Sequence, residues 1–356
     1  MTNTWNANRL ADDLNHILRY TEGLWEALRG QQLFLTGGTG FFGCWILESI
    51  AWANAQLGLG MTVRVLTRDP EAFGKKAPHL ASDPSIQLHP GDVRSFDFPR
   101  GNCAYVIHAA GSPDPKLQPS VMLETLSEGT HHTLEFAKSC RAKRVLFLSS
   151  RAVYGPQPSR ISHVPEHYRG VLDPSDPWAA YAEGKRLAER FCDIYGEKHG
   201  LQVTTARCFA SLGPYQPLDV RFASGNFIRD ALRGGPICVE SDGTAIRSYL
   251  YAADLTIWLW HILLKGQAGR VYNAGSEQEI TIADLARVVA TACGAPVEVR
   301  IAKTPSPGHV PERQLPSIER AATELGLRQT IELGEAVKRT LRWHQHTETN
   351  APSMAR

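Results

Sequence analysis

The chain has 356 residues, of which 43% are hydrophobic and 21% are charged, and its 38 basic and 36 acidic residues leave a formal net charge of +2. This length and composition are typical of one large globular domain or of two closely packed ones. The charge balance gives no electrostatic case for a nucleic-acid or anionic-membrane partner.

Three further features restrict the class of protein. The longest apolar run, LTIWLWHILL at residues 255–264, is about half as long as a membrane-spanning helix. The N-terminus is polar and has no signal-peptide pattern, so we expect a cytoplasmic protein without a membrane partner. The seven cysteines are scattered and include no C-x-x-C pair, so we expect reduced thiols and no metal site.

The order of apolar patterns along the chain predicts an α/β fold. Residues 5–29 have the spacing of one or two helices, and strand and helix patterns alternate from residue 31 onward. Such alternation is typical of a doubly wound parallel sheet with helices on both faces. The expected strands are 31–37, 63–67, 86–93, 104–110, 144–150 and 202–209, and the expected helices are 41–58, 119–140 and 178–199.

Past Gly213 the alternation loosens, and segments rich in Pro and Gly separate shorter elements. We expect helices at 225–233, 253–264 and 281–293 and strands at 247–251, 271–275 and 297–303. These patterns predict four parts: a helical extension (1–30), a dinucleotide-binding sheet domain (31–212 with 244–278), a smaller discontinuous substrate subdomain (213–243 with 279–346) and a flexible tail (347–356).

The segment TGGTGFFG places Gly37, Gly40 and Gly43 directly after the first expected strand and at the start of a helix. In this setting the first glycine permits a tight turn, the second lets the backbone approach a pyrophosphate, and the third lets the helix pack on the strand. Free N–H groups at the helix N-terminus then face the phosphates. The segment indicates a dinucleotide site, and a purely structural glycine turn is the alternative.

The next expected strand ends in VRVLTRDP, at the place where an acidic residue commonly holds the ribose hydroxyls of NAD. Thr67 stands in that place and Arg68 follows it. A guanidinium can bind a 2′-phosphate through two hydrogen bonds, so the segment favours NADP over NAD. In the alternative, Arg68 is solvated and Asp69 holds the ribose.

Four further motifs follow in chain order: GDVR, HAAG, SSRAVYG and YAEGK. Together with TGGTGFFG, they make residues from about 31 to about 343 resemble the extended short-chain dehydrogenase/reductase family, in particular its nucleotide-sugar epimerase, dehydratase and decarboxylase branch. The resemblance implies a Rossmann-type sheet, a nicotinamide cofactor and a sugar linked to a nucleoside diphosphate as substrate. It also implies a homodimer formed through the helices at 119–140 and 178–199.

The resemblance implies that Ser150, Tyr181 and Lys185 are the catalytic triad. Free tyrosine has a pKa near 10, so its phenolate must be strongly stabilised before it can take a proton near pH 7. Lys185 and the positive charge of an oxidised nicotinamide would supply that stabilisation, and Ser150 would hold the reacting oxygen. The residues implied to contact the cofactor are Gly37, Thr39, Gly40, Phe41, Phe42, Gly43, Thr67, Arg68, Asp92, Val93, His108, Ala109, Ala110, Ser149, Tyr181, Lys185 and Cys208.

The C-terminal half resembles the segment that wraps the nucleotide of the substrate. There, Asn226 and Arg247 are implied to hold the diphosphate, Val239 to border the base and Arg313 to reach the phosphates. An arginine fork suits a diphosphate because it donates two charge-assisted hydrogen bonds. Ala210 departs from the pattern, because many relatives have Asn there, and one amide contact on the sugar side is therefore missing.

The stretch SSRAVYG bears on the type of reaction. Dehydratases and decarboxylases of this branch usually carry acidic side chains just after the catalytic Ser or Thr, whereas this chain has Arg151 and Ala152. Neither side chain shuttles a proton at neutral pH, so we expect 4,6-dehydration and decarboxylation to be disfavoured. Epimerisation through a transient ketone and reduction of a keto sugar both remain. Arg151 either binds an anionic substituent of the sugar, such as a carboxylate, or it points to solvent or braces the loop that follows it.

Two other classes of function are compatible with parts of the sequence. An NADPH-dependent reductase of small carbonyl compounds would share VRVLTRDP, but it would have no diphosphate for Arg247 and Arg313 to hold. A redox sensor or scaffold that binds a dinucleotide without catalysis typically has a broken Tyr-x-x-x-Lys pair, and here both residues are present.

Overall fold

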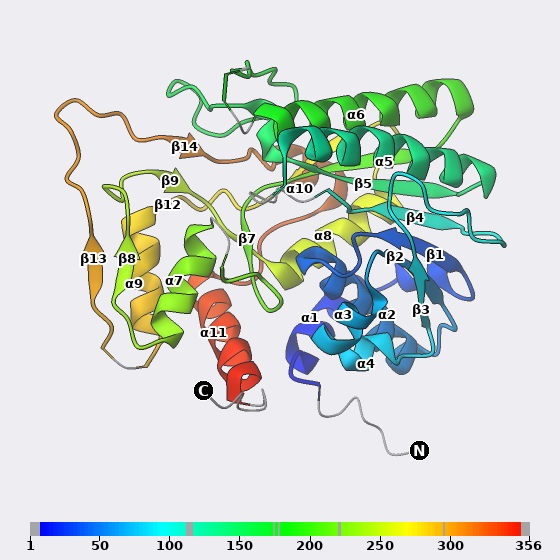
Figure 1. The fold of residues 1–356 in the computed structure, drawn as a ribbon, viewed down its shortest axis with the longest axis horizontal. Helices are drawn as coiled ribbons and strands as arrows, with labels where there is room; N and C mark the ends of the chain where they lie inside the picture. The colour runs from blue at the N-terminus through cyan, green and yellow to red at the C-terminus, as the bar shows by residue number, and fades with distance from the viewer. Residues whose placement is uncertain are drawn as a thin grey trace.

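The computed structural model describes residues 8–111, 117–173, 175–176, 179–219, 222–294 and 296–349. At its centre lies a seven-stranded sheet in the order β11-β6-β5-β4-β1-β2-β3, in which every neighbouring pair is parallel (Figure 1). This confirms the predicted Rossmann-type α/β fold. The strands are β1 (Gln32–Thr36), β2 (Thr62–Thr67), β3 (Ile86–Pro90), β4 (Tyr105–His108), β5 (Arg144–Ser150), β6 (Val203–Cys208) and β11 (Val271–Ala274).

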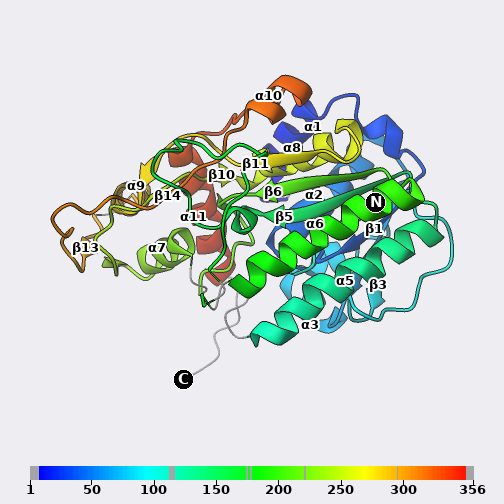
Figure 2. The same ribbon diagram turned by 90° about the horizontal axis from the view of Figure 1, so that it is seen from above.

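Side chains alternate between the two faces of the sheet and enter two different hydrophobic cores. In β1, Leu33 and Leu35 pack in one core, whereas Phe34 between them packs in the other. Separate helices cover each face, so the strands are buried from both sides (Figure 2). The helices on the first face are α1 (Ala11–Tyr20), α2 (Phe41–Leu57) and α8 (Ala252–Lys265), and those on the second are α5 (Pro119–Ser139) and α6 (Ala179–His199).

The long apolar run of the sequence forms most of α8 and is a core helix. Trp258 and Trp260 on it are 0% and 1% exposed, and the Trp260 indole donates a hydrogen bond to the hydroxyl of Ser49 on α2 at 3.0 Å. Because α8 packs against the sheet and against other helices, it is apolar nearly all round. No helix within the described parts of the chain is long and apolar enough to cross a membrane.

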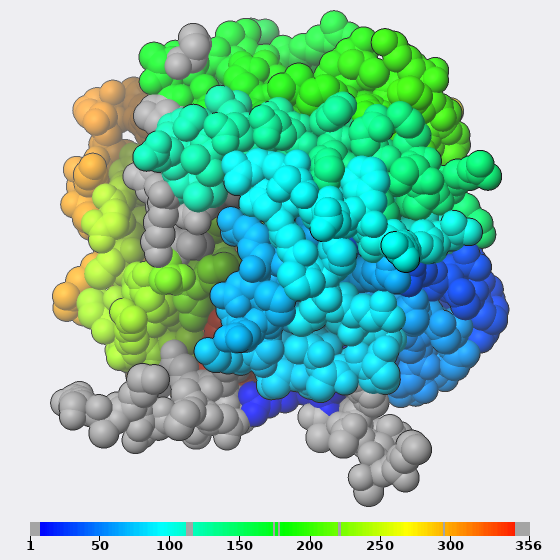
Figure 3. Space-filling model, turned by 45° about the vertical axis from the view of Figure 1, so that its right-hand side comes forward, coloured from blue at the N-terminus to red at the C-terminus, as the bar shows by residue number. Residues whose placement is uncertain are grey.

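The C-terminal part adds three small sheets, and β9 is the middle strand of one of them. Ser248 and Tyr249 separate β9 from β10, so two short strands replace the one expected at 247–251. Figure 3 shows this part, coloured yellow-green to orange, beside the blue and cyan N-terminal half. Its elements are β7 (Ser211–Leu212) with β10 (Leu250–Tyr251), β12 (Ile280–Thr281) with β9 (Ile246–Arg247) and β14 (Arg313–Gln314), β8 (Ile237–Val239) with β13 (Val299–Ile301), and α7 (Ala223–Leu232), α9 (Ile282–Ala292), α10 (Glu319–Leu325) and α11 (Leu333–Thr349).

Four helices have no counterpart among the elements expected from the sequence: α3 (Pro70–Lys76), α4 (Pro78–Ala81), α10 and α11. Helix α11 continues to residue 349, into the segment expected to be a flexible tail, and residues 350–356 lie outside the described residues. The division of the chain into four parts stays a prediction.

The N-terminal extension consists of α1 and a short 3-10 helix (Trp25–Leu28), and it is tied to the end of the chain. Asp13 on α1 is 5% exposed and accepts hydrogen bonds from the Tyr251 hydroxyl at 2.7 Å and from the Arg339 guanidinium of α11 at 2.5 Å. The first and the last described helices therefore meet through a buried carboxylate.

Candidate active site

Many of the predicted site residues lie at the carboxyl ends of the parallel strands. Thr36 at the end of β1 is in register with His108 at the end of β4, and Ser150 at the end of β5 is in register with Cys208 at the end of β6. Ligands of open α/β sheets bind at this edge, where the strand order reverses. Here the reversal lies between β1 and β4, next to the glycine turn that follows β1.

The glycine turn between β1 and α2 leaves no room for side chains at two of its positions. Gly37 has φ +71, and a Cβ there would lie 2.5 Å from the backbone of Ala109. A Cβ on Gly43 would lie 2.3 Å from the carbonyl oxygen of Gly37. Gly40, in contrast, is the exposed N-cap of the 17-residue helix α2, so a ligand can approach the helix N-terminus there. The turn fits the pyrophosphate of a dinucleotide.

Three other predicted residues, Thr39, Phe41 and Phe42, lie in this turn and at the start of α2. The Thr39 carbonyl oxygen accepts a hydrogen bond from the Lys76 ammonium of α3 at 2.7 Å. Phe41 and Phe42 are half-buried, with ring centroids 5.0 Å apart. The side chains of the turn thus frame the helix N-terminus.

At the end of β2, the structure separates the roles of three neighbouring residues. Thr67 is 6% exposed, and its hydroxyl accepts a hydrogen bond from the backbone of Asp69 at 3.2 Å. The Asp69 carboxylate caps α3 by accepting from the backbone of Ala72 at 2.9 Å. Arg68 is exposed and donates no hydrogen bond to any described residue. The carboxylate is therefore engaged by the helix, and the guanidinium is available to a ligand.

The GDVR motif follows β3. Its Asp92 is half-buried and its Val93 is buried. The Asp92 carboxylate accepts from the Arg94 guanidinium at 2.9 Å, and this hydrogen bond lowers the pKa of Asp92. Val93 is 9% exposed and packs in the core of the second face, where a Cβ on Gly129 would lie 2.7 Å from it. Only the backbone of Val93 and the Asp92 side chain therefore remain for the predicted cofactor contact.

His108 of the HAAG motif lies beneath the edge of the sheet. Its ring is 3% exposed and lies 2.7 Å from the Thr36 hydroxyl and 3.0 Å from the Thr130 hydroxyl. Burial lowers the pKa of His108 to about 3, so the imidazole is neutral at physiological pH. Ala109 and Ala110 are half-buried and follow it at the edge, beside the glycine turn.

Ser150, Tyr181 and Lys185 come together where β5 ends and α6 begins. Tyr181 and Lys185 lie one turn apart on α6 and are 8% and 3% exposed. The Lys185 ammonium lies 5.9 Å from the centroid of the Tyr181 ring and donates a hydrogen bond to the Leu148 carbonyl at 2.7 Å. The Ser150 hydroxyl accepts from the backbone of Ala152 at 3.2 Å.

The pKa values of this group are set mainly by burial. Burial raises the pKa of Tyr181 to about 12, although a hydrogen bond with Ser150 and the positive charge of Arg151 act in the opposite direction. Burial also lowers the pKa of Lys185 to about 8. We expected Lys185 to supply the stabilising charge, whereas the cation that lowers the pKa of Tyr181 in this structure is Arg151. Without ligands, the phenol is therefore neutral.

Cys208, which was predicted to contact the cofactor, lies beside the same two side chains. It is 7% exposed, and burial raises the pKa of its thiol to about 12. The thiol is therefore neutral. Within the described part of the chain, no group of His, Cys, Asp and Glu side chains is arranged to hold a metal ion.

A buried polar network behind the triad is absent from the sequence-based interpretation. Arg207 on β6 and Glu189 on α6 form an ion pair with N···O distances of 2.9 and 2.6 Å. Arg207 also donates to the Tyr154 hydroxyl at 2.9 Å, and that hydroxyl donates to the Asn273 side chain at 2.6 Å. The Ser149 hydroxyl donates to Glu189 at 2.5 Å, so its predicted cofactor contact is left to the main chain. An Arg inside a buried strand is the one sequence signal that indicates such a network.

Arg151 occupies the position after Ser150 and has no partner. It begins the 3-10 helix Arg151–Tyr154, is half-buried, and neither donates a hydrogen bond nor forms an ion pair with any described residue. Burial lowers the pKa of Arg151 to about 10, the charge of Arg247 acts in the same direction, and the Glu312 carboxylate opposes both. Arg151 is therefore partly enclosed, and its role stays a prediction.

The two arginines predicted to hold the diphosphate lie on neighbouring strands. Arg247 on β9 forms an ion pair with Glu312 at 2.9 Å, and Arg313 on β14 forms one with Glu279. Strands β9 and β14 pair in parallel, with Ile246 opposite Arg313. The Nε of Arg313 is buried and has no partner among the described residues.

The other two residues predicted on the substrate side lie on α7 and β8. The Asn226 side chain is half-buried and accepts from Arg229 at 3.1 Å. Val239 is 2% exposed and packs in the core, so only its main chain is available to border a base. Ala210 is half-buried, and its carbonyl accepts from the backbone of Leu250 at 3.1 Å.

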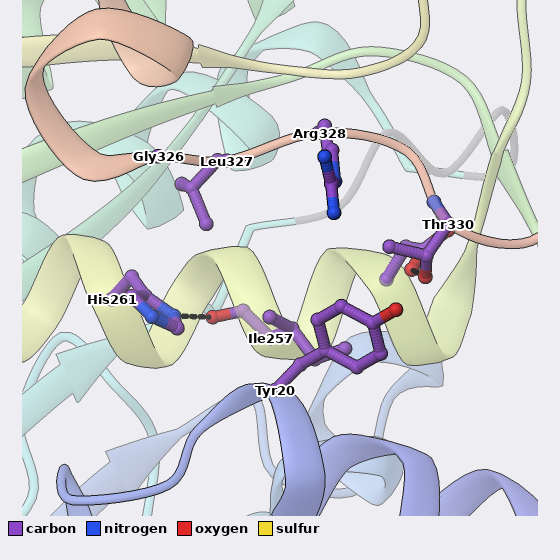
Figure 4. A pocket seen from close by; sticks show the side chains of 8 residues that line it. Tyr20, Ile257, His261, Gly326, Leu327, Arg328 and Thr330 are labelled. Carbon is purple, nitrogen blue, oxygen red and sulfur yellow. Dashed lines mark hydrogen bonds between the residues drawn. The ribbon is translucent and has the colours of Figure 1, made fainter.

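A separate small cavity of about 150 Å³ lies against α8 (Figure 4). It is bounded by Tyr20 at the end of α1 and by the segment from Gly326 to Thr330, and the His261 ring beside it hydrogen-bonds the Ile257 carbonyl at 2.9 Å. No predicted site residue lines this cavity, so it is distinct from the candidate active site.

Residues 33–275 match the model of the NAD dependent epimerase/dehydratase family. The chain belongs to this family. The match spans the glycine turn, Ser150, Tyr181, Lys185 and β9. It confirms the resemblance to nucleotide-sugar enzymes of the extended short-chain dehydrogenase/reductase type.

Named relatives of the chain carry out several reactions. UDP-glucuronic acid decarboxylase 6 of Arabidopsis thaliana is 29% identical over 308 residues, which are 86% of each chain. The crystal structure of DesIV, a dTDP-glucose 4,6-dehydratase from Streptomyces venezuelae with NAD bound, has a TM-score of 0.74 and 26% identity and covers 90% of this chain and 98% of its own. UDP-glucuronic acid 4-epimerase from Bacillus cereus shares the fold with a TM-score of 0.74 at 20% identity, over 89% of this chain and all of its own.

These names correct one expectation. Arg151 and Ala152 led us to disfavour dehydration and decarboxylation, yet relatives over most of the chain are named as decarboxylases and a dehydratase. The physical reason is that two positions do not determine the reaction. Loss of carbon dioxide from a β-keto acid sends its electron pair into the adjacent carbonyl and requires no side-chain base. Acidic groups also reach the site from distant segments, as the effect of Glu312 on Arg151 demonstrates.

Proposed function

We propose that the chain is an NAD(P)-dependent enzyme that oxidises one hydroxyl-bearing carbon of a nucleotide-diphosphate sugar to a ketone. The observation that carries this proposal is the placement of Ser150, Tyr181 and Lys185 at the same sheet edge as the open glycine turn. A proton acceptor and the site of a hydride acceptor thereby meet at one place. Oxidation of this kind is a step that epimerisation, dehydration and decarboxylation of such sugars have in common.

The chain's own residues handle the proton. Ser150 holds the reacting oxygen, and Tyr181 takes the hydroxyl proton at its phenolic oxygen. Because burial alone keeps this phenol neutral, nearby positive charge must lower its pKa before the transfer. Arg151 supplies one such charge, and the Lys185 ammonium lies 5.9 Å from the centroid of the ring. An oxidised nicotinamide, when bound, accepts the hydride and adds a further positive charge.

The end of β2 supports NADP as the preferred cofactor. Asp69 is engaged as the cap of α3, no carboxylate ends the strand, and the Arg68 guanidinium is exposed without a partner among the described residues. A 2′-phosphate suits that guanidinium, because charge-assisted hydrogen bonds to phosphate are stronger than neutral ones. Several solved neighbours carry NAD, so this preference rests on Arg68 alone.

The C-terminal part of the chain supports a nucleoside diphosphate as the portion of the substrate through which the protein binds it. Arg247 and Arg313 lie on the adjacent strands β9 and β14, and Asn226 lies on α7. The named relatives at 26–29% identity act on sugars linked to UDP or dTDP. A reductase of small carbonyl compounds would leave these arginines without a ligand to hold.

Epimerisation, in which the ketone is reduced again from the opposite face, requires only the triad and is our first candidate for the complete reaction. Decarboxylation is the second, because the curated relatives at 27–29% identity are named UDP-glucuronic acid decarboxylases. Net reduction of a keto sugar is the reverse of the first step and uses the same residues.

The helices α5 and α6 support a homodimer. They lie side by side on the second face of the sheet, and Leu123 and Leu187 on them are 36% and 44% exposed (Figure 2). A second copy that packs on these helices would cover both side chains and stiffen the helix that carries Tyr181. Light scattering at micromolar concentration should give twice the mass of one chain, and a monomer would contradict the dimer.

The proposed function is tested by the products. The purified protein is incubated with UDP- and dTDP-linked sugars and each nicotinamide, and the products are identified by mass spectrometry and NMR. An isomer of unchanged mass indicates epimerisation, loss of carbon dioxide indicates decarboxylation, loss of water indicates dehydration, and gain of two hydrogens indicates reduction. If the protein binds the dinucleotide but converts none of these sugars, the proposal is wrong.

A further inference from the structure

Beside Ser150 and Tyr181 lies a partly enclosed positive charge for which the described part of the chain provides no ion-pair partner. Arg151 follows Ser150 directly, and no described residue accepts a hydrogen bond from its guanidinium. Removing a cation from water without a partner is costly, so an enclosed arginine is retained where an anion meets it.

The surroundings of Arg151 do not supply that anion. The one carboxylate that acts on it, Glu312, is already paired with Arg247 at 2.9 Å and accepts from the Gln314 side chain at 2.5 Å. Two phenols, Tyr181 and Tyr249, also act on it, but burial raises the pKa of each to about 12, so both are neutral. Among the described residues, no unpaired anion therefore faces Arg151, and a ligand is the source of the counter-ion that we consider.

The position of Arg151 indicates which part of the ligand carries the anion. Ser150 and Tyr181 mark the reacting carbon, and Arg151 follows Ser150 in the chain and lies close enough to Tyr181 for its charge to lower the pKa of the phenol. A diphosphate has its own cations on β9 and β14, Arg247 and Arg313. The group near Arg151 is therefore a substituent of the sugar itself.

We propose that Arg151 binds a carboxylate carried by the sugar, so that the substrate is a uronic acid linked to a nucleoside diphosphate. This inference rests on the proposed function, because it places the reacting sugar next to Ser150. A carboxylate accepts two parallel hydrogen bonds from a guanidinium, which gives Arg151 both an attraction for the uronate and a means of orienting the sugar. Arg151 is then a specificity-determining residue.

Binding measurements test this proposal without turnover. The protein loaded with NADPH, which cannot oxidise an alcohol, is titrated by calorimetry with UDP, UDP-glucose and UDP-glucuronic acid, and with the corresponding dTDP compounds. The variants are Arg151→Ala, Arg151→Lys and, as a matched control, Arg160→Ala, which removes an exposed arginine from the same segment. Comparison of the six ligands distinguishes recognition of a carboxylate on the sugar from recognition of the diphosphate.

The wild type should bind the uronate at least about tenfold more tightly than the hexose, because a hydrogen-bonded ion pair is lost in the comparison. Arg151→Ala should abolish this preference and leave hexose binding unchanged, Arg151→Lys should keep part of it, and Arg160→Ala should keep all of it. Equal weakening of every ligand, UDP included, would assign Arg151 to the diphosphate and overturn the inference. If the wild type binds the hexose compounds as tightly as the uronates, the inference about Arg151 is wrong and the proposed function stands. If none of the six ligands binds, the proposed function is wrong as well.

Discussion

Glu189 and Arg207 join α6, the helix that carries Tyr181 and Lys185, to β6 through two short contacts, Nε to Oε1 at 2.9 Å and a terminal nitrogen to Oε2 at 2.6 Å. Both side chains are 13% exposed, and Ser149 donates to the same carboxylate from the end of β5. Because Glu189 lies one turn after Lys185, the ion pair holds α6 against β6, and the Ser149 hydrogen bond ties it to β5, the strand that ends at Ser150. It thus fixes the position of Tyr181 relative to Ser150.

Breaking this pair from one side should be more harmful than removing it. Arg207→Met leaves the Glu189 carboxylate enclosed without its counter-ion, so we expect the free energy of unfolding to fall by about 3–5 kcal/mol. The double variant Glu189→Leu with Arg207→Met should lose less. Urea denaturation measures both, with Arg190→Met as control, because its partner Asp193 is exposed and the pair contributes at most about 1 kcal/mol. A double variant less stable than Arg207→Met would contradict this account.

Gly40→Ala should separate folding from dinucleotide binding. A Cβ at Gly40 meets only the Gly37 carbonyl oxygen, at 3.2 Å, so the free energy of unfolding should change by less than about 1 kcal/mol. The methyl group would, however, occupy the space through which a pyrophosphate reaches the N-terminus of α2. We expect at least about tenfold weaker dinucleotide binding by fluorescence titration. Gly74→Ala in α3, where nothing lies within 4 Å, should bind normally; unchanged affinity of Gly40→Ala would exclude a phosphate site at this turn.

Tyr181→Phe keeps the ring that packs against Met122 and Leu126 and removes only the hydroxyl. Turnover should fall by about 10²–10⁴, since the proton acceptor is lost, while nucleotide affinity stays within a factor of about two. Steady-state kinetics and calorimetry on the same preparations measure the two quantities. Tyr195→Phe, which removes a hydroxyl bonded to Glu135 farther along α6, is the control and should retain activity. Retained turnover in Tyr181→Phe would mean that another group takes the proton.

Arg68→Ala tests the cofactor preference. The wild type should bind NADPH more tightly than NADH, and the variant should lose about tenfold in NADPH affinity without a change for NADH, because only the 2′-phosphate loses a charge-assisted partner. Fluorescence titration of both dinucleotides decides this. Lys75→Ala on the exposed side of α3 should alter neither affinity. If the wild type binds NADH as tightly as NADPH, the preference for NADP is refuted.

His108 should make the protein less stable in acid. Its pKa is about 3 in the folded protein and ordinarily 6.5, so between these values the unfolded chain binds a proton that the folded protein does not. The contribution of this group to stability is therefore lost as the pH falls below 6.5, by at most about 1.4 kcal/mol per pH unit. Melting temperatures between pH 7 and pH 4 should fall more steeply for the wild type than for His108→Gln, and His199→Gln at the exposed end of α6 should follow the wild type. Parallel curves for wild type and His108→Gln would show that the buried ring does not resist protonation.

The sequence patterns correctly predicted those features that depend on interactions between residues close together in the chain. The alternation of Leu33, Phe34 and Leu35 reflects a strand with a core on each side, and Gly37 and Gly43 stand where a Cβ would clash with backbone. The Tyr181–Lys185 spacing places both side chains on one face of a helix. Each of these features depends on residues that are close in the sequence.

Features that depend on distant partners were not predictable in this way. Arg207 in TTARCF was visible as a charge within a strand, but nothing in the sequence identifies Glu189 as its partner. The same holds for Arg151, whose neighbours Glu312 and Tyr249 come from other parts of the chain. The wrong conclusion about dehydration and decarboxylation arose because two adjacent residues were taken to represent a site that is assembled from several segments.

Asp13 and Arg339 are far apart in the sequence, so the contact between them can form only late during synthesis of the chain. Arg339 is synthesised 326 residues after Asp13, and until both are present the carboxylate, whose pKa burial raises, lacks its guanidinium. The N-terminal helix therefore cannot complete its packing during synthesis of the dinucleotide half, although that half can begin to fold as it emerges. A stop codon before α11 would remove Arg339, and Asp13 on α1 would keep only its hydrogen bond from the Tyr251 hydroxyl among these two contacts.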